Sequence, residues 1–436
     1  MAVSSRAVLD RAALEALQTE RLRSLLAEIL PHNAFYTRKL AGAGLLRGTA
    51  LPSRPDGSGE PSHLRSLPLT TKVELLADQE AHPPYGTALT YPLDRYCRLM
   101  QTSGTSGQPL RWLDTPESWQ WMLTNWQQIF EIVGVGRGDR LFFPFSFGPF
   151  LGFWTAYESA SQQGLWCLPG GGMSSVARLH FLLDHQATVV LCTPTYALHL
   201  AEVAEREGID LRNSAVRALI VAGEPGGSIP AVRARIEAGW NARVFDHSGM
   251  TEVGPVAIEC RENPAGLHIL EGDYIAEVID PDTLESVAPG TTGELVLTTL
   301  GRLGSPLIRY RTGDLVCIDP DLCPCGRSFV RLRGGILGRV DDMIHLRGNN
   351  LHPSTLEAVI RGVEEVAEYR IEIDRSSALA VLHVEVEPVP WAHGQDVAER
   401  VDRAIRDELL FRAEVHAVAP GSLPRYEMKA RRIGHR

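Results

Sequence analysis

Residues 187–223 read ATVVLCTPTYALHLAEVAEREGIDLRNSAVRALIVAG, and this stretch decides the fold class. Its two ends, residues 187–194 and 216–223, are short apolar runs typical of buried strands. Between them, Tyr196–Glu207 follow the spacing of an amphipathic helix. Parallel strands need a crossover connection, and a helix usually supplies it. The stretch therefore predicts an α/β fold with a largely parallel sheet.

The same alternation of strand and helix patterns runs from about residue 95 to 245. RLFFPF at residues 140–145 predicts another buried strand, and Met173–His185 predict another helix. From residue 269 to 318, strand-like segments follow one another and are joined by Pro, Gly and Asp turns. This change of pattern predicts a more antiparallel β subdomain.

A domain boundary is expected in GGILGRVDD, near residues 335–341. Beyond it, strand patterns alternate with helix patterns, at Pro353–Arg361 for example, which predicts a small α+β unit. We therefore expect a large N-terminal domain over residues 1–337, with layered α/β sheets and a β subdomain at about 269–335. A small C-terminal domain would cover residues 338–436.

The charge of the chain narrows the classes of protein to which it can belong. Its 43 Lys and Arg against 53 Asp and Glu give a net charge of −10. This balance argues against a nucleic-acid-binding protein, which would carry a basic domain or stripe. Seven Cys in 436 residues form no disulfide framework. Without an apolar signal core or a membrane-spanning run, we expect a cytoplasmic protein with reduced thiols.

Only three of the 43 basic residues are lysines, at Lys39, Lys72 and Lys429. The others are arginines, so a retained Lys marks a position where a compact, flexible ammonium can be needed. Lys429 ends the segment PRYEMK, close to the C-terminus, and is the candidate for chemistry. We expect Lys39 to be a solvated charge and Lys72 to be a helix-start residue without a catalytic role.

Several loops could hold a nucleotide. Gln101–Pro109 (QTSGTSGQP) can bring several backbone N–H groups and hydroxyls onto one phosphate, although a flexible loop has the same composition. Its spacing is not that of a P-loop. Ala222–Pro225 (AGEP) directly follow a predicted buried strand, where open α/β sheets bind ligands, although an ordinary turn also fits.

Three further segments carry carboxylates. Asp246–Glu252 (DHSGMTE) place one after a Gly-containing turn, where it could hold Mg²⁺ beside phosphates. Tyr310–Asp314 (YRTGD) and Gly338–Asp342 (GRVDD) offer an Asp that can accept two ribose hydroxyls and an Arg that can reach ribose or phosphate. Each could also be a turn with a salt-bridged charge.

Taken together and in this order, these segments resemble those of the adenylate-forming (acyl-CoA synthetase) superfamily, and within it the phenylacetate–CoA ligase branch. HNAFYTRKL, LPLTTKVELL, SPLIRYRTGD and GRVDDMIHLRGNNLHPSTLE extend the resemblance over nearly the whole chain. The resemblance implies an ATP- and Mg²⁺-dependent ligase that converts a carboxylic acid to an acyl-adenylate. Coenzyme A would then take the acyl group, releasing AMP, after a mobile C-terminal domain has rotated about a hinge.

The resemblance also implies roles for individual residues. The ATP-binding residues would be Ser103, Gly104, Thr105, Ser106, Gly107, Gly223, Glu224, Pro225, Asp246, His247, Ser248, Gly249, Met250, Asp314 and Arg339. The catalytic residues would be Lys429, Thr251 and Glu252, with Glu252 as the Mg²⁺ ligand. The hinge would be Asp341, and the loop that enters the site for the coenzyme A step would contain Arg347 and Gly348.

Two positions depart from the pattern of many relatives. Gln108 stands where they carry a phosphate-loop Lys, which removes one cation from the triphosphate and predicts a raised KM for ATP. Ser248 stands where they carry an aromatic residue that stacks on adenine. Neighbours, His247 among them, are then expected to hold the base.

The run Phe143–Phe150 (FPFSFGPF) is expected to line the acyl pocket, with Phe145, Phe147 and Gly148 at its wall. Aromatic walls suit an aryl or apolar acid, although at least half of these rings are expected to be plain core. The run differs from the Tyr/Gly-rich stretch of phenylacetate ligases, which argues against phenylacetate itself.

Cys260, His268, Cys323 and Cys325 make a candidate closed, structural zinc site. The alternative is a set of ordinary buried residues, because the spacing is not that of a zinc finger. Some relatives carry a similar cluster, which favours zinc.

Three activities stay open at this point. The leading one is acid–coenzyme A ligation, with a small acid, ATP and coenzyme A as partners. A second is adenylation with transfer to a carrier protein, an amine or a cofactor. A third is a non-catalytic nucleotide- or acyl-binding protein, against which the retained Glu252, Asp314, Arg339 and Lys429 argue. A homodimer is left open.

Overall fold

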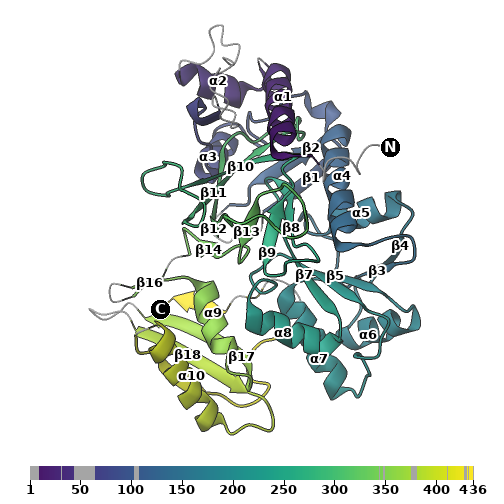
Figure 1. Cartoon of the computed structure of the whole chain (residues 1–436), viewed down its shortest axis with the longest axis vertical. Coiled ribbons are helices and arrows are strands. Elements are labelled where there is room, and N and C mark those ends of the chain that lie inside the picture. The colour runs from purple at the N-terminus through teal and green to yellow at the C-terminus, as the bar shows by residue number, and fades with distance from the viewer. Residues whose placement is uncertain are drawn as a thin grey trace.

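The computed structural model describes residues 9–30, 32–43, 64–102, 108–342, 344–346, 349–374, 381–409, 411–426, 430 and 432–435. It is a mixed α/β structure with a larger unit and a smaller one that carries the C-terminus (Figure 1). The predicted fold class is therefore confirmed. No helix among the described residues is long and apolar enough to cross a bilayer.

An eight-stranded sheet lies at the centre of the larger unit, in the order β13-β9-β8-β7-β6-β5-β3-β4. The strands from β7 to β4 pair in parallel, as the sequence predicts, and the rest pair antiparallel. The bounds of the eight strands are β3 Arg140–Phe143, β4 Trp166–Pro169, β5 Val189–Cys192, β6 Ala218–Val221, β7 Arg243–Met250, β8 Gly254–Ile258, β9 Gly266–Ile269 and β13 Arg331–Arg333.

Both faces of the parallel strands are buried, which explains their unbroken apolar runs. In β5, Val189 and Leu191 pack into one hydrophobic cluster, while Val190 and Cys192 pack into another. The two clusters lie under different helices. The helices of the larger unit are α1 Arg11–Ile29, α2 Ala34–Gly42, α3 Lys72–Ala81, α4 Pro116–Val133, α5 Trp154–Gln162, α6 Ser175–Asp184, α7 Pro194–Arg206 and α8 Pro230–Trp240, with short 3-10 helices η2 Leu64–Ser66 and η3 Leu93–Arg95.

Helix capping shifts the predicted boundaries by a few residues. Helix α7 begins at Pro194, two residues before the predicted start, because Thr193 accepts a hydrogen bond from the Tyr196 N–H at 3.2 Å and caps it. Pro194 fits the first helical position, where its missing N–H costs no hydrogen bond. The same cap ends the preceding strand at Cys192.

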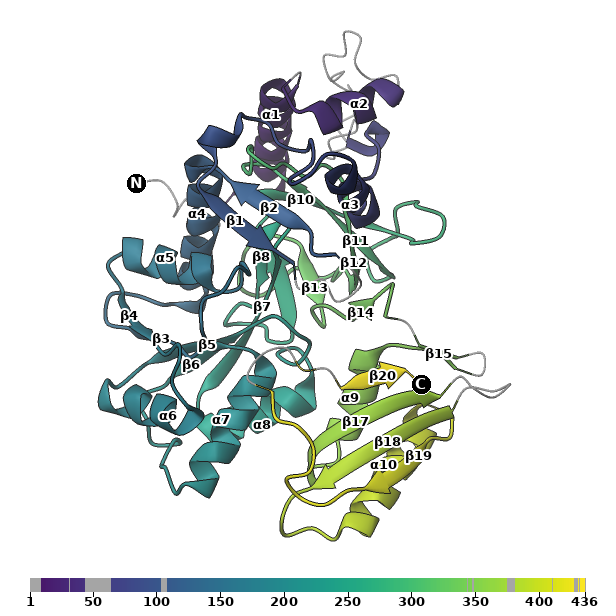
Figure 2. The same cartoon turned by 180° about the vertical axis from the view of Figure 1, so that it is seen from behind.

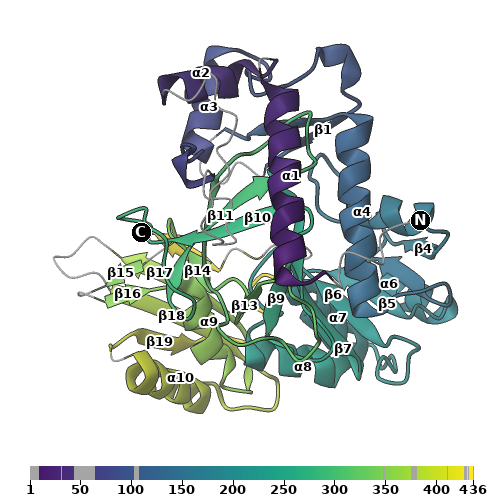
Figure 3. The same ribbon diagram turned by 45° about the horizontal axis from the view of Figure 1, so that its top comes forward.

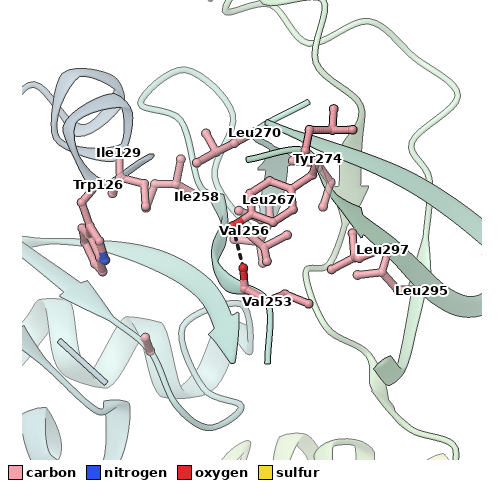
Figure 4. Close-up of a cluster of buried hydrophobic side chains, with 14 of the residues drawn as sticks. Trp126, Ile129, Val253, Val256, Ile258, Leu267, Leu270, Tyr274, Leu295 and Leu297 are labelled. Atoms are coloured by element: carbon pink, nitrogen blue, oxygen red, sulfur yellow. Dashed lines mark hydrogen bonds between the residues drawn. The ribbon is translucent and has the colours of Figure 1, made fainter. Parts of the chain in front are cut away.

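A smaller antiparallel sheet, β10-β11-β12-β14, confirms the change of pattern expected after residue 269. Its strands are β10 Tyr274–Ile279, β11 Thr292–Thr299, β12 Tyr310–Cys317 and β14 Gly338–Arg339, and a separate hairpin pairs β1 Arg98–Gln101 with β2 Arg111–Asp114. Figure 3 shows α1 beside α4, crossing close to β10. Tyr274 at the start of β10 donates a hydrogen bond to the Val253 carbonyl at 2.9 Å inside the shared core (Figure 4).

The smaller unit has a hydrophobic core of its own, whose buried members all lie between Ile344 and Phe411. Its sheet has the order β19-β18-β17-β20, with α9 and α10 packed beside it (Figure 2). The elements are β15 Ile344–Leu346, β16 Asn349–Leu351, α9 Pro353–Arg361, β17 Val366–Asp374, β18 Val381–Pro388, α10 Gly394–Leu409, β19 Glu414–Ala417 and β20 Ile433–His435.

Candidate active site

A cavity of about 300 Å³ opens at the carboxyl ends of the parallel strands. Several parts of its wall directly follow one of these strands. Residues 144–148 follow β3, and Ala222 and Gly223 follow β6. Cys192 is the last residue of β5, and Thr193 comes directly after it. The end of β7 contributes His247 and residues 249–251. This is the position where open α/β sheets bind ligands.

Aromatic rings form a large part of the cavity wall. Phe145 and Phe147 lie with their centroids 5.1 Å apart, and Trp154 lies 4.4 Å from Phe147. Phe153 and Trp126 continue the wall from α5 and α4. The predicted acyl-pocket residues Phe145, Phe147 and Gly148 all line this cavity. Their role toward a substrate stays a prediction.

His247 is buried in the same wall, and its ring centroid lies 4.6 Å from that of Trp126. Its Nδ1 lies 2.7 Å from the Ala257 carbonyl, which can only accept, so Nδ1 carries the hydrogen. Burial lowers the pKa of His247 to about 4. The neutral ring therefore leaves Nε2 as an acceptor.

The loop Thr251–Glu252 borders the cavity and carries the predicted magnesium ligand. Thr251 lines the cavity, while Glu252 is buried directly behind it. Arg302, fully buried, donates to the carbonyls of Thr251 at 2.7 Å and Glu252 at 2.8 Å. The same guanidinium makes two hydrogen bonds, of 2.7 and 2.6 Å, to the carboxylate of Asp114. The sequence interpretation missed Arg302 and Asp114, which hold this loop in place.

Lys72 begins α3 after the Thr71 cap, as the sequence predicts, and its Nζ lies 3.2 Å from Oε1 of Glu252. The sequence interpretation gave Lys72 no role, and this contact places its ammonium beside the predicted magnesium ligand. Tyr310 donates to the same Oε1 at 3.5 Å. A cation thus lies beside the carboxylate predicted to bind metal, in a chain that has Gln108 in its phosphate loop. Lys39 is not solvated, since its side chain is 11% exposed and pairs with Glu74 at 2.6 Å.

The predicted ribose and hinge residues lie together at the edge of the antiparallel sheet. Arg339 and Asp314 are register partners in β14 and β12, with Nη1 3.0 Å from Oδ1. Arg339 also donates to Asp341 at 2.8 and 3.0 Å. Burial lowers the pKa of Arg339, whereas the carboxylates of Asp341 and Asp314 raise it. The net effect is a pKa above the usual value for arginine. The pair could present a carboxylate and a guanidinium to one ligand.

Glu224 connects the two units of the molecule. Its Oε1 accepts from the Thr195 N–H at 2.9 Å, and its Oε2 accepts from the Ala430 N–H at 2.8 Å. Three arginines make polar contacts across the same interface. Arg425 lies 3.1 Å from Glu202, Arg432 donates to Thr195 at 3.2 Å, and Arg235 donates to the Val366 carbonyl at 2.7 Å. Such polar contacts are common between domains of one chain.

Several predicted residues have other placements. Lys429, Arg347, Gly348 and the loop Ser103, Gly104, Thr105, Ser106 and Gly107 lie outside the described residues.

Asp246, although predicted to bind ATP, does not line the cavity. It is buried against Ser228, which donates to it, and burial raises its pKa to about 6. Ser248, on the opposite face of β7 from His247, and Pro225 do not line the cavity either, whereas Gly249 and Met250 do.

Cys260, His268, Cys323 and Cys325 form one compact cluster, with their ligand atoms all within 4.8 Å of one another. Cys260 and Cys323 have their sulfurs 3.6 Å apart, and Cys325 Sγ lies 3.4 Å from His268 Nε2. His268 Nδ1 is 3.1 Å from the Phe329 carbonyl, which fixes the ring and turns Nε2 toward the sulfurs. The ligand types and ring anchoring fit a tetrahedral zinc site.

Comparison with known proteins places both units in one family. Residues 56–301 match the AMP-binding enzyme family and residues 348–436 match the AMP-binding enzyme C-terminal domain. The chain is 33% identical to the phenylacetate–coenzyme A ligase of Thermus thermophilus, over 98% of this chain and 97% of that protein.

Among solved structures, the chain is similar to 2-hydroxyisobutyryl-CoA ligase in the postadenylation state in complex with R3-HIB-AMP. The TM-score is 0.89 at 30% identity, covering 98% of this chain and 90% of the other. The same ligase in complex with 2-HIB-AMP and CoA in the thioesterification state gives a TM-score of 0.72 at 30% identity, covering 99% and 91%.

Proposed function

The chain belongs to the AMP-binding enzyme family, and from this premise we propose that it is an ATP-dependent, AMP-forming acid–coenzyme A ligase of the phenylacetate–CoA ligase-like branch. One observation carries this assignment. The aromatic cavity ends at Thr251, directly in front of Glu252 and Lys72, so a pocket for the body of an acid adjoins a site suited to metal and phosphate. An apolar acid held in this cavity would have its carboxylate beside the nucleotide.

The reaction has two half-reactions. A carboxylate oxygen of the acid attacks the α-phosphorus of ATP, a new P–O bond forms, and the bond to the bridging oxygen breaks as pyrophosphate leaves. The thiolate of coenzyme A then attacks the acyl carbon and AMP leaves. The neighbouring ligase structures that contain acyl-adenylate, and acyl-adenylate with CoA, support this order.

Residues of this chain have distinct tasks in the proposal. Glu252 would hold Mg²⁺, which neutralises phosphate charge, and Lys72 would share that task. Asp314 and Arg339 would orient the ribose and Thr251 the α-phosphate. Lys429 would bridge carboxylate and phosphate oxygens, as its motif match implies. The phosphate loop at Ser103–Gly107 and the coenzyme A loop at Arg347 and Gly348 complete the proposed site.

The organisation of the chain follows the same proposal. Residues 1–337 would form the adenylation domain and residues 338–436 the mobile domain, with the hinge at Asp341. All seven cysteines are free thiols in the structure, and we assign the enzyme to the cytoplasm, where ATP and coenzyme A are available. The cysteine–histidine cluster would hold one structural Zn²⁺, because three sulfurs and one imidazole leave no position for water.

Two partial reactions test the function. Acid-dependent exchange of pyrophosphate into ATP is expected, and so is AMP release that depends on coenzyme A with the same acid. Lys429→Ala should abolish the exchange. Exchange without coenzyme A-dependent AMP release would point instead to a carrier protein, amine or cofactor acceptor. Absence of exchange over a broad panel of aryl, fatty and amino acids would contradict the enzymatic assignment.

A further inference from the structure

Two polar atoms near the aromatic cavity make no hydrogen bond to another described residue, and one of them belongs to His247, which the sequence analysis assigned to adenine. The first is Nε2 of His247, whose lone pair is left over because Nδ1–H is used by the Ala257 carbonyl. The second is Oγ1 of Thr155, a fully buried hydroxyl that has no hydrogen-bond partner among the described residues. Both residues line the cavity.

Three other polar side chains that line the cavity, Thr193, Ser146 and Tyr196, already have partners. Thr193 caps α7, Ser146 accepts from the Gly172 N–H at 3.2 Å, and the Tyr196 hydroxyl accepts from Arg178 at 2.5 Å. Buried polar groups in proteins are nearly always satisfied. Thr155 Oγ1 has no exposed surface, so it is closed to a ligand in the cavity, whereas Nε2 of His247 is not among the atoms buried without a partner. Nε2 of His247 is therefore the acceptor that a ligand in this cavity can meet.

The cavity also limits the charge of its ligand. Among the described residues that line it, none is Asp, Glu, Lys or Arg, and His247 is neutral because burial lowers its pKa to about 4. A second charge on the body of the acid would be buried among aromatic rings without a counter-ion, which is strongly unfavourable. Amino acids and dicarboxylic acids are disfavoured on this ground.

We infer that the substrate is an uncharged aromatic monocarboxylic acid whose ring carries a hydroxyl or amino group, and that His247 Nε2 accepts the hydrogen bond from that group. The inference rests on the proposed ligase function. Such a substituent donates to Nε2. An unsubstituted ring would leave Nε2 desolvated and unpaired, and a methoxy group can accept but cannot donate.

Matched acids test the inference on the full-length enzyme. Pyrophosphate exchange is measured with unsubstituted phenylacetate and benzoate and with their 2-, 3- and 4-hydroxy, amino and methoxy derivatives. We expect the best hydroxy or amino isomer to exceed its unsubstituted parent in kcat/KM by about ten- to hundredfold, the effect of leaving a buried partner unpaired. The methoxy counterpart of that isomer should show no such gain.

Variants then assign the preference to His247. His247→Phe keeps the ring shape but removes the acceptor, and should bring the ratio of kcat/KM for the substituted acid to kcat/KM for the unsubstituted acid close to one. This ratio is the readout, because His247 is also among the residues expected to hold adenine and its loss can lower exchange with every acid. His247→Gln, whose amide oxygen can accept, should keep part of the ratio. His185→Phe, an exposed histidine outside the cavity wall, is the control and should leave the ratio as in the wild type.

The outcomes separate the inference from the function on which it rests. If unsubstituted or methoxy acids match the best donor-bearing acid in the wild-type enzyme, the inference is wrong and the ligase assignment stands. The same holds if His247→Phe lowers kcat/KM for all acids by one common factor. If no acid in the panel supports exchange, the inference falls together with the proposed function.

Discussion

Arg302 illustrates how much one buried side chain can determine in this site. It is fully buried with Asp114, and it also donates to the carbonyls of Thr251 and Glu252. We expect Arg302→Met to lower the free energy of unfolding by about 3–5 kcal/mol, because it leaves the Asp114 carboxylate buried without a counter-charge. Urea unfolding measures this loss.

The exposed pair Arg95–Glu117, with side chains 54% and 65% exposed, provides the control. Arg95→Met should change the free energy of unfolding by less than about 1 kcal/mol, as is usual for surface pairs. Equal losses in the two variants would mean that Arg302 does not hold the Thr251–Glu252 loop as described.

A second prediction at the residue scale concerns Lys72 and the binding of MgATP. Its Nζ lies 3.2 Å from Glu252, and Gln108 supplies no cation in the phosphate loop. Lys72→Met should therefore raise the KM for MgATP by about tenfold or more, the effect of one lost charged hydrogen bond, while the KM for the acid changes little. Steady-state kinetics with ATP as the varied substrate measure it. Lys39→Met, which removes the lysine paired with Glu74, is the matched control, and an equal rise in both variants would contradict the role of Lys72.

At the scale of elements, the cysteine–histidine cluster brings the neighbouring Cys260 and His268 together with a segment that lies more than 50 residues further along the chain. Cys260 follows β8, His268 lies in β9, and Cys323 and Cys325 lie in the segment before β13. We expect the purified enzyme to contain about one zinc per chain. Cys323→Ser should lose most of that metal and lower the melting temperature, because the metal ties these segments together.

Elemental analysis and thermal unfolding measure both effects. Cys317→Ser is the control, since Cys317 is also a buried free thiol of the β subdomain but lies outside the cluster. Wild-type enzyme without zinc, even after expression in zinc-supplemented medium, would refute the metal site.

At the scale of the whole molecule, the relative placement of the two units is held by few contacts. The chain superposes better on the postadenylation state of the related ligase than on its thioesterification state, with TM-scores of 0.89 and 0.72. In this arrangement Glu224 accepts the N–H of Ala430, the residue after Lys429. Glu224 is thereby a positioning residue for the segment that carries the proposed catalytic lysine.

Glu224→Gln should slow the adenylation half-reaction by about tenfold or more, because an amide in place of the carboxylate weakens a charged hydrogen bond to Ala430 or Thr195. Thioester formation from preformed acyl-adenylate and coenzyme A should change little, since the related ligase in its thioesterification state is less similar to this arrangement, with a TM-score of 0.72. Glu205→Gln, an exposed glutamate on α7, is the control. A purely structural defect would lower both half-reactions, and a defect in adenine binding alone would raise the KM for ATP without lowering kcat.

The sequence by itself determined the classes of element and much of their order. The apolar runs at β5 and β6, and the helix pattern between them, depend on neighbours two to four residues apart, so local spacing was enough to predict them. The motifs were likewise readable, because the backbone turns that hold phosphate and ribose need particular residues at short intervals. The sequence could suggest the cysteine–histidine cluster, but it could not show that the four side chains meet, since they are up to 65 residues apart.

Only the tertiary structure decided which distant residues share a site. Lys72 reaches Glu252, and Arg302 reaches Asp114, across separations of 180 and 188 residues. No local pattern encodes such pairs, because they depend on how α3, β2 and the antiparallel sheet pack around one loop. The same holds for His247, which the sequence placed in a candidate nucleotide-binding segment, whereas the structure places it in strand β7. Its free acceptor became apparent only once Ala257 was seen to take its other nitrogen.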